Sequence, residues 1–202
     1  MPSDTDTRSA TGTKPSYLGL LNAISNAESA AGVYLEAWAD VTPNADLACT
    51  LRLVAARERS HGEVFCRRIA ELGYSLRKKP DPRGAAQLAR LADPAISDLD
   101  KIPPRGEGAS DPFAEIRRRI SDGEFDGMTV NLMNWYITEE KDSAQRLREA
   151  YDCVRDMAGG KRKAKAASDD GPSADAEAMM ACMTAGFARL EKSLDKLVKA
   201  SK

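Results

Sequence analysis

The sequence predicts an all-α protein, an antiparallel four-helix bundle with a long crossover, and three observations lead to this prediction. Aromatic residues make up only 5% of the 202 residues, while alanine, leucine, arginine, glutamate and lysine, which favour helices, are abundant. Apolar residues recur at spacings of three and four along four long stretches. The first two stretches are only a few residues apart and must form a hairpin, whereas a long proline-rich connection precedes the third.

Capping residues delimit the first two predicted helices. Ser16 can cap a first helix that runs to about Asp40. Thr42 and Pro43 then supply an N-cap and a first-turn proline for a second helix, which ends near Gly73. The connection between them is so short that the helices are predicted to be antiparallel neighbours.

The connection after the hairpin has a different character. Residues 74–111 contain five prolines and leave room for short helical pieces such as 84–92. A connection of this length usually crosses the length of a small domain. A short helix is predicted at 112–120, and the capping-box pattern from Ser121 to Glu124 is predicted to open a long helix that ends near Ala158.

These elements define the predicted domain organisation. Residues 1–15 are rich in Ser, Thr and Asp and are expected to be a disordered tail. The helical domain spans 16–158, and the low-complexity segment 159–173 is expected to be a flexible linker. The segment 174–200 is predicted to form a structural helix that packs on the bundle, because its apolar seam is unbroken.

The composition excludes several classes of function. With 30 basic and 31 acidic residues, the net charge of −1 gives no electrostatic basis for binding nucleic acid. No apolar run approaches the roughly 18–20 residues that span a bilayer, and the polar N-terminus lacks the apolar stretch of a signal peptide. We therefore expect a cytoplasmic protein without a membrane partner. Its scattered cysteines are expected to be reduced, mostly buried thiols: Cys49, Cys66, Cys153 and Cys182.

The apolar seams of the first two helices are interrupted near their middles. The first seam carries Glu28, and the second carries Glu58 and, three residues later, His61, the one histidine of the chain. An unpaired carboxylate in a core costs on the order of several kcal/mol. The apolar seam positions are Leu21, Ile24, Ala31, Leu35 and Trp38 in the first helix, and Leu47, Leu51, Val54, Phe65, Ile69 and Leu72 in the second.

The three interrupting residues are predicted to lie at the same level. Glu28 and Glu58 are each about 15 residues from the hairpin turn, which is roughly 22–23 Å at the rise of an α-helix. His61 follows one turn further along the same stripe. Singly, each has a simpler interpretation, as a boundary glutamate or a hydrogen-bonded core histidine. Their coincidence favours a divalent cation, which would neutralise converging carboxylates in an apolar core.

The long third helix has a similar interruption. An offset of 82 residues superposes its stripe on that of the second helix, so that Glu58 matches Glu140 and His61 matches Ser143. Glu139 lies on the neighbouring stripe. The rotation of this helix about its axis decides whether Glu139 or Glu140 faces the core, and the sequence leaves both as candidate ligands.

At these residues the chain resembles the ferritin-like superfamily, in which one helix supplies a glutamate and the next supplies Glu-x-x-His. The match is Glu28 and, thirty residues later, Glu58-Arg59-Ser60-His61. The hairpin that contains these residues is similar to that of encapsulated ferritins and of the rubrerythrin-like branch. The resemblance covers residues 17–73. The resemblance implies a ferritin-like four-helix bundle, a di-iron site with Glu58 bridging and His61 as a terminal ligand, and oxidation of ferrous ion by O₂ or peroxide.

The chain departs from this family in one respect. Members carry a second Glu-x-x-His, whereas the candidates here are Glu140-x-x-Ser143 and Glu191-x-x-Leu194. Three possibilities follow. The second metal position is built from carboxylates alone, it is completed across a homodimer or larger oligomer, or the site is reduced to one metal or lost. Manganese is an alternative to iron. We expect Glu140 to close the site within one chain. The alternative function is a non-catalytic helical bundle that serves as an interaction or structural protein.

Overall fold

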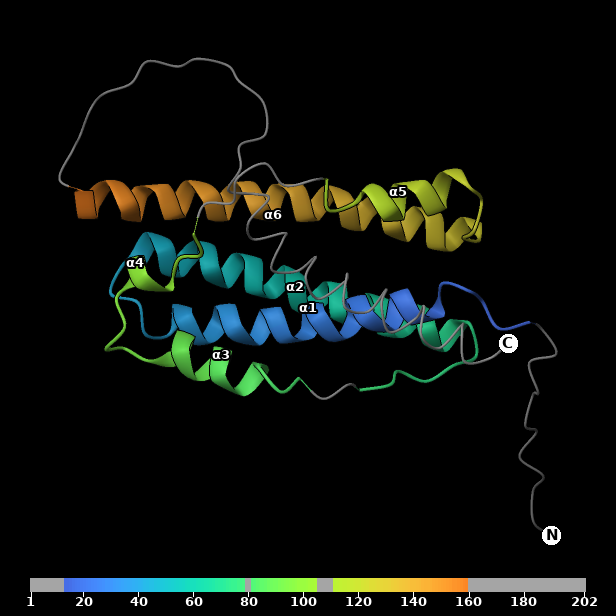
Figure 1. Cartoon of the computed structure of the whole chain (residues 1–202), viewed down its shortest axis with the longest axis horizontal. Coiled ribbons are helices and arrows are strands. Elements are labelled where there is room, and N and C mark those ends of the chain that lie inside the picture. The colour runs from blue at the N-terminus through green and yellow to red at the C-terminus, as the bar shows by residue number, and fades with distance from the viewer. Residues whose placement is uncertain (1–12, 79–80, 105–110, 160–202) are drawn as a thin grey trace, which may run out of the picture.

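The computed structural model describes residues 13–78, 81–104 and 111–159, which form six helices joined by turns and loops (Figure 1). Over these ranges there is no strand, so the predicted all-α class is confirmed. The fourth long helix was predicted at residues outside these ranges, so the four-helix bundle with its crossover stays a prediction. The helices are α1 (Leu18–Ala39), α2 (Ala45–Glu71), α3 (Gly84–Ala92), α4 (Asp98–Lys101), α5 (Ala114–Ser121) and α6 (Gly127–Gly159).

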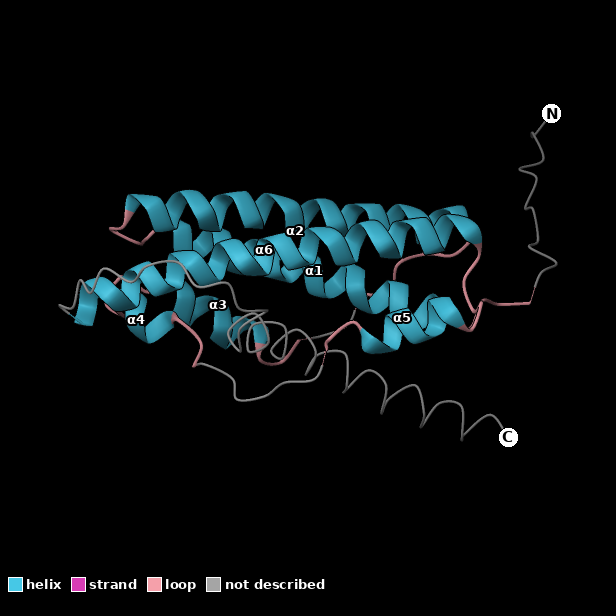
Figure 2. Ribbon diagram, turned by 90° about the horizontal axis from the view of Figure 1, so that it is seen from above, coloured by secondary structure: helices cyan, strands magenta, loops and turns pink. Residues whose placement is uncertain are grey.

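Helices α1 and α2 form the predicted antiparallel hairpin, and α6 lies alongside α2 (Figures 1 and 2). Two ion pairs show that α6 runs antiparallel to α2. Arg57 in α2 pairs with Asp142 in the middle of α6, whereas Arg68, further along α2, pairs with Asp126, which directly precedes α6. Helix α3 packs against α1, and α5 lies beside the first turns of α6. Three long helices therefore provide the frame of the molecule.

The apolar core is divided into two clusters. One lies toward the end of α2 and contains Phe65, Met133 and Tyr136, and the other lies toward the hairpin turn and contains Trp38 and Leu147. The buried glutamates and the histidine occupy the level between these clusters. The predicted seams of all three helices face this core, since every predicted seam position is buried except Ala31 and Leu72, which are half-buried.

The predicted N-caps of the hairpin helices are wrong by one or two residues. The N-cap of α1 is Tyr17, whose side chain does not cap, and the N-cap of α2 is Asn44, which accepts hydrogen bonds from two amides of the first turn. The Thr42 hydroxyl donates to Asp98, 2.6 Å away, and accepts from the amide of Asn44 at 3.2 Å, which is the N-cap itself and not a residue of the first turn. The end of α2 is as predicted: Gly73 adopts a φ of 84°, a left-handed conformation that suits glycine.

The predicted capping box from Ser121 to Glu124 is also wrong, because these residues end α5 rather than open α6. Gly123, with a φ of 68°, makes the left-handed turn, and the Glu124 amide donates back to the Arg119 carbonyl at 3.0 Å. Helix α6 begins after Asp126, whose carboxylate accepts from the amides of the first turn. Other predicted elements, the helical piece at 84–92 and the short helix near 112–120, correspond to α3 and α5.

The expectation of mostly buried cysteines is contradicted for the described part of the chain. Cys49 and Cys153 are exposed and Cys66 is half-buried. Cys49 follows buried Leu47 by two residues, which turns it to the outer face of α2 despite its apolar neighbours. Cys182 lies outside the described residues.

Several other expectations concern residues outside the described ranges. These are the disordered tail at 1–15, apart from residues 13–15, the linker at 159–173, apart from Gly159, and the C-terminal helix at 174–200. Among the helices that are described, none combines the length and apolarity needed to cross a membrane.

Candidate metal centre

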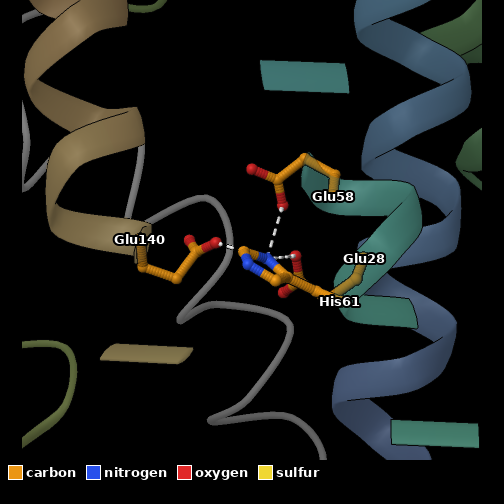
Figure 3. A group of neighbouring side chains, drawn as sticks. All are labelled: Glu28, Glu58, His61 and Glu140. Atoms are coloured by element: carbon orange, nitrogen blue, oxygen red, sulfur yellow. Dashed lines mark ion pairs between the residues drawn. The ribbon is translucent and has the colours of Figure 1, made fainter. Parts of the chain in front are cut away.

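Three helices bring four polar side chains together at the centre of the molecule. Glu28 comes from α1, Glu58 and His61 come from α2, and Glu140 comes from α6 (Figure 3). All four are at most 2% exposed. We call them the carboxylate–histidine cluster. One donor atom from each lies within 4.8 Å of the others, which brings together the residues that interrupt the three apolar seams.

The imidazole of His61 presents one nitrogen to the interior of the cluster. Its Nδ1 atom is 3.1 Å from Oε1 of Glu140, 3.7 Å from Oε2 of Glu28 and 4.0 Å from Oε2 of Glu58. Three carboxylates from three helices therefore surround a single ring nitrogen (Figure 3). Glu28 and Glu58 lie at the same level, as the helical rise predicts.

The other ring nitrogen faces Glu139. The Nε2 atom of His61 is 3.0 Å from Oε2 of Glu139, whose side chain is 32% exposed. The rotation of α6 thus places Glu140 inside the cluster and Glu139 behind the imidazole. The ring also packs edge-on against Trp135, with centroids 5.0 Å apart. Glu139 and Trp135 lie between the cluster and solvent.

The cluster contains five donor atoms that have no hydrogen-bond partner in the described part of the chain. They are Oε2 of Glu28, both carboxylate oxygens of Glu58, Nδ1 of His61 and Oε1 of Glu140. Nδ1 and the Glu140 oxygen are close, but they are not aligned for a hydrogen bond. A buried polar atom without a partner costs about 1–3 kcal/mol, and more when it is charged. One donor atom from each of the four residues lies within 4.8 Å of the others, and unpartnered atoms so close together call for a common partner.

Burial shifts the proton affinities of these groups. It raises the pKa of the Glu28 carboxyl to about 8, and the charge of Glu140 acts in the same direction, whereas neighbouring Glu58 and the hydrogen bond from Tyr136 lower this pKa. The pKa of Glu58 is likewise raised well above its ordinary value by burial and then by Glu28. Burial alone lowers the pKa of His61, but Glu140 and Glu139 outweigh it, and that pKa is raised. Without a cation, the cluster therefore retains protons that solvent-exposed carboxyls release.

Tyr136 is a further residue of the site that the sequence did not identify. Its hydroxyl donates to Oε1 of Glu28 at 2.8 Å, and its ring packs edge-on against His61. Burial and the charge of Glu28 raise the pKa of Tyr136 well above its ordinary value, which keeps the hydroxyl protonated as a donor. In the sequence, the feature that could have identified Tyr136 is its position on the apolar stripe of α6, one turn before Glu140.

Two glycines allow α1 and α2 to approach closely beside the cluster. A Cβ atom at Gly62 would lie 2.4 Å from Oγ of Ser29 and 3.1 Å from its backbone nitrogen. A Cβ at Gly32 would lie 2.6 Å from Cγ of Arg59 and 3.0 Å from the Ala55 carbonyl oxygen. Because Gly62 follows His61, the close approach at this level determines how near the imidazole lies to the carboxylate of α1.

The donor set fits a divalent metal ion. Carboxylate oxygens and a neutral imidazole are the ligands that iron, manganese and zinc take from proteins. A ligating histidine commonly bonds a carboxylate through its other ring nitrogen, which fixes the tautomer and the ring orientation. Glu139 has the position that this role requires. The residues present would satisfy a cation, and a cation would satisfy the unpartnered atoms.

Comparison of the chain with protein-family models, with curated proteins and with solved structures gives no match.

Proposed function

We propose that this chain is a ferritin-like iron-binding protein that oxidises ferrous ion with O₂ or peroxide, using Glu28, Glu58, His61 and Glu140 as ligands. The observation that carries the proposal is the set of five buried donor atoms without partners in the described residues, in a cluster whose four residues each bring one donor atom within 4.8 Å of the others. A protein without a ligand for these atoms would gain stability by replacing them with apolar side chains. Their presence in the core is explained if a cation binds there.

The choice of iron follows from the mixture of ligands. Three carboxylates favour hard cations, and one imidazole adds affinity for first-row transition metals, so that Fe²⁺ and Mn²⁺ fit this set best. The three carboxylates together carry a charge of −3 when ionised, which balances a trivalent ion in a site with little solvent. This balance stabilises the oxidised state of a bound metal, and iron is the metal whose +2 and +3 states both occur commonly in proteins. Manganese is the alternative cofactor.

The residues around the cluster support this chemistry. Bound iron would supply one electron per ion as it passes from Fe²⁺ to Fe³⁺, so that reduction of peroxide to two waters would consume two ferrous ions and two protons, and reduction of O₂ to two waters would consume four of each. Glu139 holds His61 by its outer nitrogen and leaves Nδ1 free to bind. Tyr136 holds Glu28 through one oxygen and leaves the other free. The apolar clusters on either side exclude water, which strengthens the electrostatic attraction between the carboxylates and the cation.

The experiment compares metal content and ferrous-ion oxidation for the purified full chain and two variants. Glu58→Gln removes a ligand charge without changing the size of the side chain, and Glu63→Gln makes the same change at an exposed position five residues along α2. We expect stoichiometric iron and oxidation in the wild type and in Glu63→Gln, and loss of both in Glu58→Gln. A wild-type chain without stoichiometric metal would overturn the proposal and leave a structural helical bundle.

A further inference from the structure

The unpartnered donor atoms of the cluster suit one metal ion better than two. One donor from each of the four residues lies within 4.8 Å of the others. Two donors on opposite sides of one ion, with bonds of about 2.0–2.2 Å, are about 4.0–4.4 Å apart. Ions of a two-metal site lie about 3.5–4 Å apart, so that its outermost donors spread over roughly 8 Å. The spacing in this chain matches a single coordination sphere that tightens slightly on binding.

The number of free donors leads to the same result. Within the described part of the chain, five atoms of the cluster lack a hydrogen-bond partner. With Glu58 bound through both oxygens, these five protein donors would nearly fill one six-coordinate ion and leave one position for water or an oxidant. Two such ions would need about twice as many. The 2.8 Å hydrogen bond from Tyr136 already uses one acceptor site of the other oxygen of Glu28, which weakens that oxygen as a ligand to a second ion.

Ser143 occupies the position at which a second Glu-x-x-His motif would place its histidine, and polar contacts surround it. The internal match of α2 with α6 aligns Ser143 with His61, and Ser143 is only 1% exposed. Its hydroxyl accepts a hydrogen bond from Nη1 of Arg57 at 3.4 Å, and the same guanidinium pairs with Asp142. A serine hydroxyl is a poor ligand compared with imidazole, and the adjacent positive charge of Arg57 opposes a second cation.

We propose that the cluster holds a single metal ion per chain, and that Ser143, Arg57 and Tyr136 close the position of a second. This inference rests on the proposed function and deepens it, because it assigns a mononuclear centre where the resemblance to di-iron proteins implies a dinuclear one. The cluster is complete within one chain, with Glu140 in the place that a second Glu-x-x-His would occupy.

The primary test is titration of the metal-free full chain with Mn²⁺, followed by equilibrium dialysis with metal analysis and by electron paramagnetic resonance. The expected result is one bound ion per chain with the hyperfine pattern of an isolated Mn²⁺. Two ions per chain with the signal of an exchange-coupled pair would overturn the inference while leaving the metal-binding function intact. A chain that binds no Mn²⁺ and, under anaerobic conditions, no Fe²⁺ would overturn both.

A gain-of-ligand variant tests the role of Ser143. Ser143→His restores the missing imidazole in the buried position, whereas Ser60→His adds a histidine at an exposed position of α2 and measures non-specific binding. We expect two Mn²⁺ ions per chain for Ser143→His and one for Ser60→His. A folded Ser143→His chain that still binds one ion would contradict the role assigned to Ser143. If this variant does not fold, the wild-type stoichiometry decides the inference.

Discussion

The buried carboxyls make the metal-free protein sensitive to pH. The folded-state pKa of Glu28 is about 8, above its ordinary value of 4.5, so that between these values the folded chain binds more protons than the unfolded chain. The free energy of unfolding must therefore fall as the pH rises through this window, by up to about 1.4 kcal/mol per pH unit for each such carboxyl. The raised pKa of His61 acts in the same direction.

Chemical denaturation in the presence of a chelator measures this dependence. We expect the stability of the wild type to decline from about pH 5 to pH 8, and the decline to be shallower in Glu28→Gln, which has no carboxyl to titrate. Stability that stays constant over this range would show that the carboxyls are already ionised in the folded chain, and would contradict the prediction.

Glu58 illustrates a conflict between stability and binding at a single residue. In Glu58→Gln the buried acid is replaced by an amide whose donors can bond the neighbouring carboxylates of Glu28 and Glu140. We expect the metal-free variant to be more stable than the wild type by about 1–3 kcal/mol at pH 8, and its metal affinity to fall by roughly 100-fold or more. Thermal unfolding with and without metal measures both effects. A loss of stability without metal would contradict the prediction.

Glu139 should act through His61 rather than as a ligand. In Glu139→Ala the Nε2 atom loses its 3.0 Å partner, and the ring is no longer held with Nδ1 toward the cluster. We expect the affinity for Mn²⁺ to fall by about 10–100-fold while the stoichiometry stays the same. The exposed Glu149→Ala on the same helix serves as the control and should bind as the wild type does. A change in stoichiometry would assign Glu139 a ligand role.

At the scale of single residues, the sequence identified the cluster because charge on an apolar seam is visible in the helical period. Glu28, Glu58 and His61 could be found in this way. The choice between Glu139 and Glu140 could not, because it depends on the rotation of α6, which follows from the packing of Tyr136 against Phe65 and Phe113. Both glutamates contact the imidazole, one at each nitrogen.

At the scale of helices, the glycine contacts between α1 and α2 position the ligands. Gly62→Ala places a methyl group 3.1 Å from the backbone nitrogen of Ser29, which can yield only if the helices move apart. We expect a loss of stability, because overpacking costs about 1–3 kcal/mol, more than alanine gains over glycine in a helix. The affinity for metal should fall with it, since Glu28 moves away from His61.

The control for this change is Gly127→Ala at the start of α6. A Cβ atom there meets no described atom within 4 Å. Its stability and metal affinity should stay close to those of the wild type, as measured by denaturation and Mn²⁺ titration. Equal effects of the two substitutions would show that the close approach of the hairpin is not what positions the ligands.

Helix lengths and pairing could be predicted from periodicity, but several helix ends could not. Thr42 would be a good cap by its type, yet its hydroxyl bonds Asp98, which is 56 residues away in the chain. Tyr17 begins α1 because its ring packs on Phe125 with centroids 5.1 Å apart and its hydroxyl bonds Asp126. Rules based on local sequence do not include such distant contacts. Here these contacts outweigh capping preferences, which are worth about 1 kcal/mol.

At the scale of the whole molecule, binding of a metal should stabilise the fold without changing the oligomeric state of the protein. The cluster takes ligands from α1, α2 and α6 of one chain, so a cation links all three long helices. A ligand at 100 times its dissociation constant raises the free energy of unfolding by about 2.7 kcal/mol. Sedimentation with and without Fe²⁺ under anaerobic conditions should show the same species, whereas a shift from monomer to dimer on metal addition would indicate a site shared between two chains.

Anomalous diffraction from crystals of the metal-loaded full chain tests the central claim most directly, because it locates the ion. Data collected on either side of the iron or manganese absorption edge should give a single peak per chain. We predict that this peak lies within bonding distance of Nδ1 of His61 and Oε2 of Glu28, with Glu58 and Glu140 completing the sphere. A peak elsewhere on the chain, or no peak at the cluster, would contradict the account.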